Sequence, residues 1–163
     1  MHNRMTILII EDDQNICDAF EEIISKRNEV ELIGKTNSSI EAIKFVKENK
    51  PEAIIVDLEL HHGIGSGFDF LRELKNINVK TKPIVVVNTN IISDIVYEKL
   101  HQGLADIIFY KKQKDYSPKT VIDSLVLLRN NGEKSDTITN NNIENVNQII
   151  EDIINTELDL IRN

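Results

Sequence analysis

The sequence predicts an α/β fold in which helices cover both faces of a parallel sheet. Short apolar runs end abruptly at polar residues, which is typical of strands that are buried on both faces. Segments with the apolar spacing of helices lie between these runs. The unit of strand then helix repeats five times up to about residue 130. Such alternation indicates parallel strands joined by crossover helices.

Each element has its own local signal. Four strands are predicted from apolar runs, at residues 5–10, 53–56, 84–87 and 107–110. The run at 30–34 is weaker and alternates, which is typical of an edge strand. Helical stripes follow the strands, formed by Ile16, Phe20, Ile23 and Ile24; Ile40, Ile43, Phe45 and Val46; Phe68, Leu71 and Leu74; Ile92, Ile95, Val96 and Leu100; and Val121, Ile122, Leu125 and Leu128. Asn37, Ser38 and Ser39 offer N-caps, and Pro118 suits a first helical turn.

Composition narrows the function classes. The chain has 163 residues, which fits one domain, or one domain with an appendage. A net charge of -8 argues against binding nucleic acid through a basic surface. Cys17 is the single cysteine, so no intrachain disulfide can form. No apolar run approaches the ~20 residues that span a bilayer, and we expect a cytoplasmic protein.

The C-terminal quarter has a different pattern. Residues 131–142 are polar and rich in asparagine, which predicts a linker after a domain at 5–130. The apolar spacing of residues 143–163 then predicts one strongly amphipathic helix, whose broad apolar face must pack against another surface to be buried. This extra helix packs on the domain, pairs with a second copy, or begins a further domain absent from this chain.

Polar residues that follow the strands are the candidates for chemistry, because ligands bind at the carboxyl ends of parallel strands. Glu11, Asp12 and Asp13 follow the first strand, and Asp57 follows the third. Asn88 and Thr89 follow the fourth strand, and Lys111 follows the fifth. Clustered carboxylates suit Mg²⁺, and a hydroxyl and an ammonium supply donors for phosphoryl oxygens. Asp57 could then be a nucleophile that forms an aspartyl-phosphate.

The stretches ILIIEDD and IIVDLEL, with Thr89 and Lys111 in order, resemble the receiver domain of two-component response regulators. The resemblance covers about three quarters of the chain and implies a flavodoxin-like (CheY-like), doubly wound sheet of five parallel strands with five helices. It implies that Asp57 accepts a phosphoryl group from a sensor histidine kinase. Thr89 and Lys111 would contact that group. The protein would be a signalling phospho-acceptor, with enzymatic character only in its own phosphorylation and dephosphorylation.

The resemblance also implies a Mg²⁺ site. Glu11 and Asp12 match the acidic pair, Asp57 shares the metal, and the backbone carbonyl of Glu59 completes the protein ligands. The segment FYKKQKDYSP further resembles a clostridial group of regulators, in which a helical part akin to the DNA-binding domain of the sporulation regulator can follow. We therefore expect transcriptional output, with DNA contacted only through an output domain that this chain does not contain.

Three positions depart from the family pattern. Asn90 stands where a small residue usually follows the threonine, which narrows access to the phosphoryl group unless Asn88 holds the threonine position instead. Lys112 replaces a proline, so the cis peptide bond usual there is in doubt. Ile108 replaces the switch aromatic, a role that Phe109 or Tyr110 could take.

Two other hypotheses about the function are considered. One is a receiver-like interaction module that works without phosphorylation, which the three departures favour. The other is a haloacid-dehalogenase-type phosphatase, for which Glu59 only loosely supplies the second acid. Taken alone, the acids after the first strand could simply cap a helix. His61 and His62 are expected to be an exposed loop pair rather than metal ligands.

Overall fold

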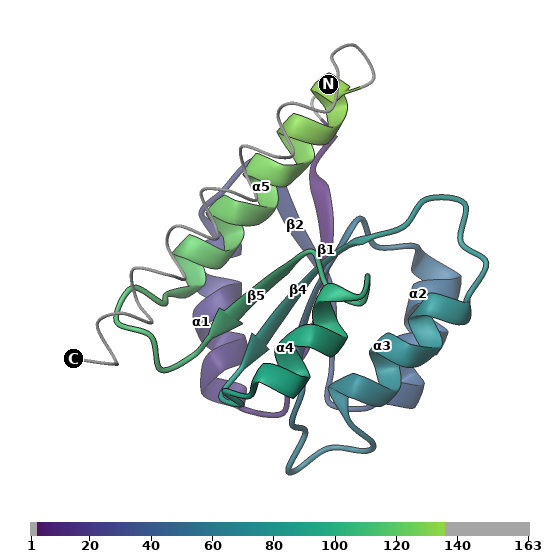
Figure 1. Cartoon of the computed structure of the whole chain (residues 1–163). Coiled ribbons are helices and arrows are strands. Elements are labelled where there is room, and N and C mark those ends of the chain that lie inside the picture. The colour runs from purple at the N-terminus through teal and green to yellow at the C-terminus, as the bar shows by residue number, and fades with distance from the viewer. Residues whose placement is uncertain (1–2, 136–163) are drawn as a thin grey trace. The chain divides into compact units, whose positions relative to one another are not determined.

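The computed structural model describes residues 3–135, and side chains up to residue 132. Within this range five parallel strands form one sheet in the order β2-β1-β3-β4-β5. The strands are β1 (Met5–Ile10), β2 (Val30–Thr36), β3 (Ala53–Asp57), β4 (Ile84–Thr89) and β5 (Ile107–Tyr110). The predicted flavodoxin-like architecture is therefore confirmed, including the place of β2 at an edge of the sheet (Figure 1).

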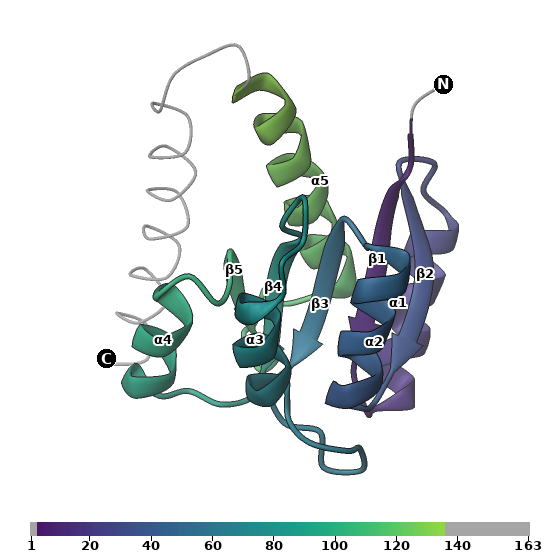
Figure 2. The same ribbon diagram turned by 90° about the vertical axis from the view of Figure 1, so that its right-hand side faces the viewer.

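Five helices connect and follow the strands. They are α1 (Gln14–Ser25), α2 (Ser39–Asn49), α3 (Gly67–Asn76), α4 (Asp94–His101) and α5 (Pro118–Ser135). Helices α2, α3 and α4 lie on one face of the sheet, and α1 lies on the other with the first turns of α5 (Figures 1 and 2). None of the described helices is long and apolar enough to cross a membrane.

The core divides into the two layers that this arrangement requires. Apolar side chains that alternate along each strand point to opposite faces, because side-chain direction has a period of two. On one face β1, β3 and β4 pack against α2, α3 and α4, through Leu8, Ile54, Val87, Val46, Phe70 and Leu100 among others. The opposite face buries Cys17, Phe20 and Ile24 of α1 and Val121, Ile122 and Leu125 of α5.

Helix starts follow the predicted capping chemistry. Ser38 caps α2 by accepting a hydrogen bond from the backbone N–H of Glu41, and Pro118 opens α5. Ser66 and Asp69 form a reciprocal capping box at α3. These caps fix the points at which the strand ends give way to helices, and so they place the polar loops at one edge.

Several details differ from the sequence predictions. Ile40, in the stripe predicted for α2, is 72% exposed. Ile92 precedes α4 and Ile95 lies on its outer side, so both are exposed, at 68% and 66%. The stripe predicted for this helix is thus wrong at these two positions, and Leu100 is its buried anchor. Exposed apolar residues are common enough on protein surfaces that spacing alone cannot exclude them.

Helix α5 continues through residues 131–135, which we assigned to the linker. A single glycine, Gly132, costs a helix only about 1 kcal/mol relative to alanine, so polar composition did not end the helix there. The described chain divides into two compact units, with the boundary between Val126 and Leu127. The rest of the predicted linker and the predicted helix at 143–163 lie outside the described residues.

Candidate functional site

Strand order and register bring the predicted site residues to one edge of the sheet. Asp57 is the last residue of β3 and lies opposite Asn88 in β4. Thr89 ends β4 and lies opposite Tyr110, the last residue of β5. Because β1, β3, β4 and β5 are successive neighbours, their carboxyl ends converge as the sequence predicted.

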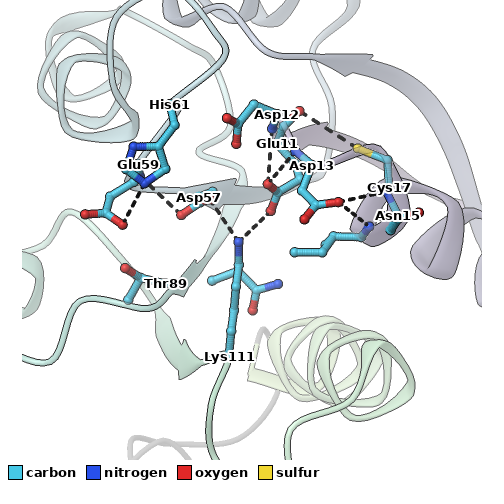
Figure 3. Close-up of polar contacts among 12 residues, drawn as sticks. Glu11, Asp12, Asp13, Asn15, Cys17, Asp57, Glu59, His61, Thr89 and Lys111 are labelled. Atoms are coloured by element: carbon cyan, nitrogen blue, oxygen red, sulfur yellow. Dashed lines mark hydrogen bonds and ion pairs between the residues drawn. The ribbon is translucent and has the colours of Figure 1, made fainter.

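Lys111 lies at the centre of this edge. Its ammonium Nζ is 2.8 Å from Glu11 Oε2 and 2.9 Å from Asp57 Oδ2 (Figure 3). The three side chains are 8%, 3% and 7% exposed, so the ion pairs are shielded from water. Burial lowers the pKa of Lys111, but the hydrogen bonds to Glu11 and Asp57 and the charges of these two acids together outweigh it, and the net shift is upward. The ammonium therefore stays charged at neutral pH and offsets part of the negative charge.

Three carboxylates form the candidate metal centre. One oxygen each from Glu11, Asp12 and Asp57 lie within 4.8 Å of one another. Burial raises the pKa of Glu11 to about 7, even though Lys111 acts in the opposite direction. An all-oxygen donor set of this kind fits Mg²⁺, which binds through a few carboxylates and retains waters. A divalent cation would also remove the repulsion that Lys111 alone leaves among three acids.

Asp12 lies at the open side of the cluster. Its Oδ2 accepts a hydrogen bond of 2.7 Å from the backbone N–H of His62. Burial would raise the pKa of Asp12, but this bond and other hydrogen bonds outweigh it and lower the pKa. Asp12 is thus ionised at neutral pH and half-buried, as an accessible metal ligand must be.

Asp13 has a structural role instead. It is the N-cap of α1, and its Oδ1 accepts hydrogen bonds from the backbone N–H groups of Asn15 and Ile16. The capping interpretation, which we considered for all three acids, therefore holds for Asp13. The side chain of Glu11 points into the cluster instead. Its Oε1 accepts hydrogen bonds from the backbone N–H groups of Asp12 and Asp13, and its Oε2 accepts one from the Lys111 ammonium.

Glu59 and Thr89 border the cluster. The backbone N–H of Glu59 donates to Asp57 Oδ1 at 3.2 Å, and its side chain lies 3.3 Å from His61 (Figure 3). Thr89 is fully buried, and its Oγ1 accepts a hydrogen bond from the backbone N–H of Ile91. The roles of the Glu59 carbonyl as a metal ligand and of Thr89 as a phosphoryl contact stay predictions.

The residues that depart from the family pattern have distinct surroundings. Asn90 and Lys112 are exposed, whereas Ile108, Phe109 and Tyr110 are all half-buried. Within residues 3–135 every peptide bond is trans, so the doubt about a cis bond after Lys111 was justified. The role of Phe109 or Tyr110 as a switch aromatic stays a prediction.

The glycine-rich loop between β3 and α3 is fixed at its centre by backbone hydrogen bonds. The backbone N–H of Ile64 donates to Asn37 O, and that of Ser39 donates to Ile64 O, at 3.0 and 2.9 Å. A Cβ atom on Gly63 would lie 2.0 Å from Asn37 O. Gly63 therefore permits close backbone contact with the loop before α2. This contact holds the neighbouring residue His62, whose backbone N–H donates to Asp12.

Sequence reasoning did not find the contact between Asn88 and Tyr116. Asn88 Nδ2 donates to the Tyr116 hydroxyl at 2.7 Å, and the Asn88 side chain is buried. The two residues are 28 positions apart, so no local periodicity connects them. The one available signal was an amide at the end of an otherwise apolar buried strand.

Comparison with known proteins identifies the family of the chain. The family model described as "Response regulator receiver domain" matches residues 7–124. The transcriptional regulatory protein DesR of Bacillus subtilis is 28% identical over 85 residues, covering 52% of this chain and 40% of that protein. A protein-glutamate methylesterase/protein-glutamine glutaminase of Rhodopseudomonas palustris is 27% identical over 109 residues, covering 64% of this chain and 28% of that protein. The chain thus spans less than half the length of these curated relatives.

Solved structures show the same fold. The signal receiver domain of a LuxO-type repressor from Vibrio parahaemolyticus has a TM-score of 0.67 at 20% identity, covering 82% of this chain and 96% of that one. A CheY-like receiver domain from Methanospirillum hungatei has a TM-score of 0.67 at 17% identity, covering 82% and 99%. With the family match over more than half of the chain, this protein belongs to the response regulator receiver domain family.

Proposed function

We propose that this protein accepts a phosphoryl group on Asp57 from a phosphohistidine of a sensor histidine kinase, in a reaction that depends on Mg²⁺. The observation that carries the proposal is the buried cluster in which Lys111 bridges Glu11 and Asp57 beside Asp12. An acceptor carboxylate, an acidic metal-binding pair and a fixed cation are the parts that phosphoryl transfer to an aspartate requires.

The chemistry can be assigned to this chain's own groups. A carboxylate oxygen of Asp57 attacks phosphorus, an O–P bond forms, and the P–N bond to histidine breaks with its electron pair left on the imidazole nitrogen. The Lys111 ammonium stabilises negative charge on the phosphoryl oxygens, because it already lies 2.9 Å from Asp57. Bound Mg²⁺, held by Glu11, Asp12, Asp57 and the Glu59 carbonyl, would neutralise charge on the same oxygens.

The acceptor then acts as a signal. The phosphoryl group adds negative charge and strong acceptors at the end of β3. Thr89, at the end of β4, and Lys111, in the loop after β5, would reorient toward it and shift a two-state equilibrium. The protein's role is signalling rather than turnover of an external substrate. This holds although some relatives carry methylesterase names, since the chain spans only 28% of the relative from Rhodopseudomonas palustris.

The output belongs to the same proposal. The relative from Bacillus subtilis is named a transcriptional regulatory protein, which supports transcriptional control as the destination of the signal. The protein would act in the cytoplasm. DNA would be contacted through an output domain, and the amphipathic segment at 143–163 would join that domain or a second copy of the chain. Light scattering of the full chain, and of a version that ends at Asn130, tests self-association with and without a phosphoryl analogue.

Intact mass after treatment with acetyl phosphate and Mg²⁺ tests the central step. We expect a gain of one phosphoryl group (~80 Da) in the wild type and none in Asp57→Asn. Omission of Mg²⁺ should abolish the gain. The matched control is Asp13→Asn, which alters the next acid along the chain, a residue that caps α1, and should keep the gain.

If acetyl phosphate gives no adduct, beryllofluoride binding separates a receiver that accepts only from its kinase from a module that is not phosphorylated. Beryllofluoride binds as a phosphoryl analogue without a donor, so binding by wild type but no acetyl phosphate adduct would indicate a receiver that accepts only from its kinase. Absence of both would favour an interaction module that works without phosphorylation and would refute the proposal.

A further inference from the structure

One buried polar contact beside the acidic cluster has no part in the chemistry above. Asn88 is 1% exposed at the end of β4, and its Nδ2 donates to the Tyr116 hydroxyl at 2.7 Å. Its Oδ1 is buried without a hydrogen-bond partner in the described part of the chain. A buried amide is costly unless it is hydrogen-bonded, so Tyr116 is the contact that makes this asparagine tolerable.

The two residues connect segments that belong to the site. Asn88 is paired in register with Asp57 on one side and with Phe109 on the other. Tyr116 lies on the loop that begins with Lys111. Their hydrogen bond therefore joins the strand next to the acceptor to the loop that carries the lysine.

The same loop is attached to β4 at its other end. The backbone N–H of Lys111 donates to Thr89 O at 2.9 Å. Between the two attachments the loop closes on itself, because Gln113 N–H donates to Tyr110 O and Tyr116 N–H donates to Gln113 O, both at 3.1 Å. The loop is thus held as a compact unit by two neighbouring residues of one strand.

Tyr116 also lies within electrostatic reach of the cluster. Burial raises the pKa of its hydroxyl, and the charges of Lys111, Glu11 and Asp57 all act on it as well. Lysine has a long flexible stem, so the location of its ammonium depends on how well its backbone is fixed. A loop that could lift away from β4 would carry Lys111 away from both carboxylates.

We infer that Asn88 and Tyr116 are positioning residues, which fasten the loop to β4 and thereby hold the Lys111 ammonium between Glu11 and Asp57. The kinetic consequence of this inference rests on the proposed function, whereas the structural part does not. Tyr116→Phe is the sharpest test, because it removes the hydroxyl and keeps the ring. Ser25→Ala is the control, since it removes a hydroxyl whose hydrogen bond, to Glu22 O, lies within α1.

Hydrogen–deuterium exchange on the full chain reads the structural part without any phosphodonor. We expect Tyr116→Phe to speed exchange of the Lys111, Gln113 and Tyr116 amides about tenfold, with exchange in β1 and β3 unchanged. Ser25→Ala should leave the three loop amides unchanged. Unchanged loop exchange in Tyr116→Phe, or faster exchange throughout the sheet, would overturn the inference.

The kinetic part uses the rate of adduct formation with acetyl phosphate. Tyr116→Phe should slow it about tenfold in the wild type, and should have little effect in a Lys111→Met background, because the lysine is then already absent. An equal slowing in both backgrounds would show that Tyr116 acts independently of Lys111 and would refute the inference. If the wild type neither forms an adduct nor binds beryllofluoride, the proposed function fails, and the exchange experiment alone decides the positioning role.

Discussion

Replacement of Lys111 by methionine tests the charge balance of the site most directly. The change removes the ammonium that lies 2.8 Å from Glu11 and 2.9 Å from Asp57, and it keeps an unbranched stem of similar volume. Removing one partner of a buried ion pair typically costs about 3–5 kcal/mol, because the remaining charges are left uncompensated. With side chains only 3–8% exposed, we expect a loss of that size in the free energy of unfolding, at pH 8 and without Mg²⁺.

The loss should shrink at lower pH. Burial raises the pKa of Glu11 to about 7, above its ordinary value of 4.5, so the folded state binds a proton more readily than the unfolded state. A raised carboxyl pKa makes stability fall as pH rises from that ordinary value through about 7. Lys111 opposes this shift, so its removal raises the Glu11 pKa further. At pH 6 Glu11 is then protonated, needs no cation, and the variant should lie closer to the wild type.

Magnesium should restore part of the loss. A cation bound with 100-fold excess over its dissociation constant stabilises the folded state by about 2.7 kcal/mol. The variant should gain more from Mg²⁺ than the wild type does, because no ammonium competes with the metal among the three acids.

Urea denaturation followed by circular dichroism, at pH 6 and 8 with EDTA or Mg²⁺, measures all three effects. Lys112→Met is the matched control, since it removes the same charge one residue away at an exposed position. It should change stability by less than about 0.5 kcal/mol. Equal stability of Lys111→Met and wild type in EDTA at pH 8 would refute the reasoning, as would an identical Mg²⁺ increment in both.

Three further predictions follow from single contacts. Mg²⁺ should bind more tightly as pH rises from about 6 to about 8, because Glu11, with a pKa of about 7, must lose its proton to bind the metal. Calorimetry in two buffers of different ionisation enthalpy would detect the released proton, and pH-independent binding would contradict the assignment of Glu11 as a ligand. Gly67→Ala should lower the free energy of unfolding by about 1–3 kcal/mol or more in urea denaturation, because the added Cβ would lie 2.0 Å from Asp57 O. Gly132→Ala in α5, where the added Cβ would meet nothing within 4 Å, should raise it by up to about 1 kcal/mol. Equal effects of the two changes would show that Gly67 is not crowded by Asp57 O. Asp13→Ala should cost about 1 kcal/mol as a lost N-cap and leave Mg²⁺ affinity within about twofold, and a large loss of affinity would place Asp13 among the ligands.

The strands and the site edge were predictable because their signals are local or topological. Buried parallel strands need continuous apolar runs, and each run of this chain ends at a polar residue that the sheet order brings to the same edge. The strand ends themselves were placed short by one or two residues at Thr36, Asp57 and Thr89. Polar side chains mark the end of an apolar pattern, but the backbone can stay paired one or two residues beyond it.

Contacts between segments far apart in sequence were not predictable. Nothing local connects Asn88 with Tyr116, or Asp12 with the backbone of His62, 50 residues away. The same limit applies to the exposure of Ile95, because a helix of eight residues fixes a stripe only weakly. Register, loop packing and side-chain pairing decide these features, and each depends on the assembled sheet.

The contacts of Lys111 suggest how a local charge change could reach the rest of the domain. The ammonium has three N–H donors and already uses two, on Glu11 and Asp57. A phosphoryl group on Asp57 would offer new oxygens and added negative charge, so the ammonium would be drawn from the carboxylate toward the phosphoryl group. The lysine backbone is bonded to Thr89 O, and its loop to Asn88 through Tyr116. Movement of the ammonium would therefore pull on two consecutive residues of β4, the strand that leads into α4.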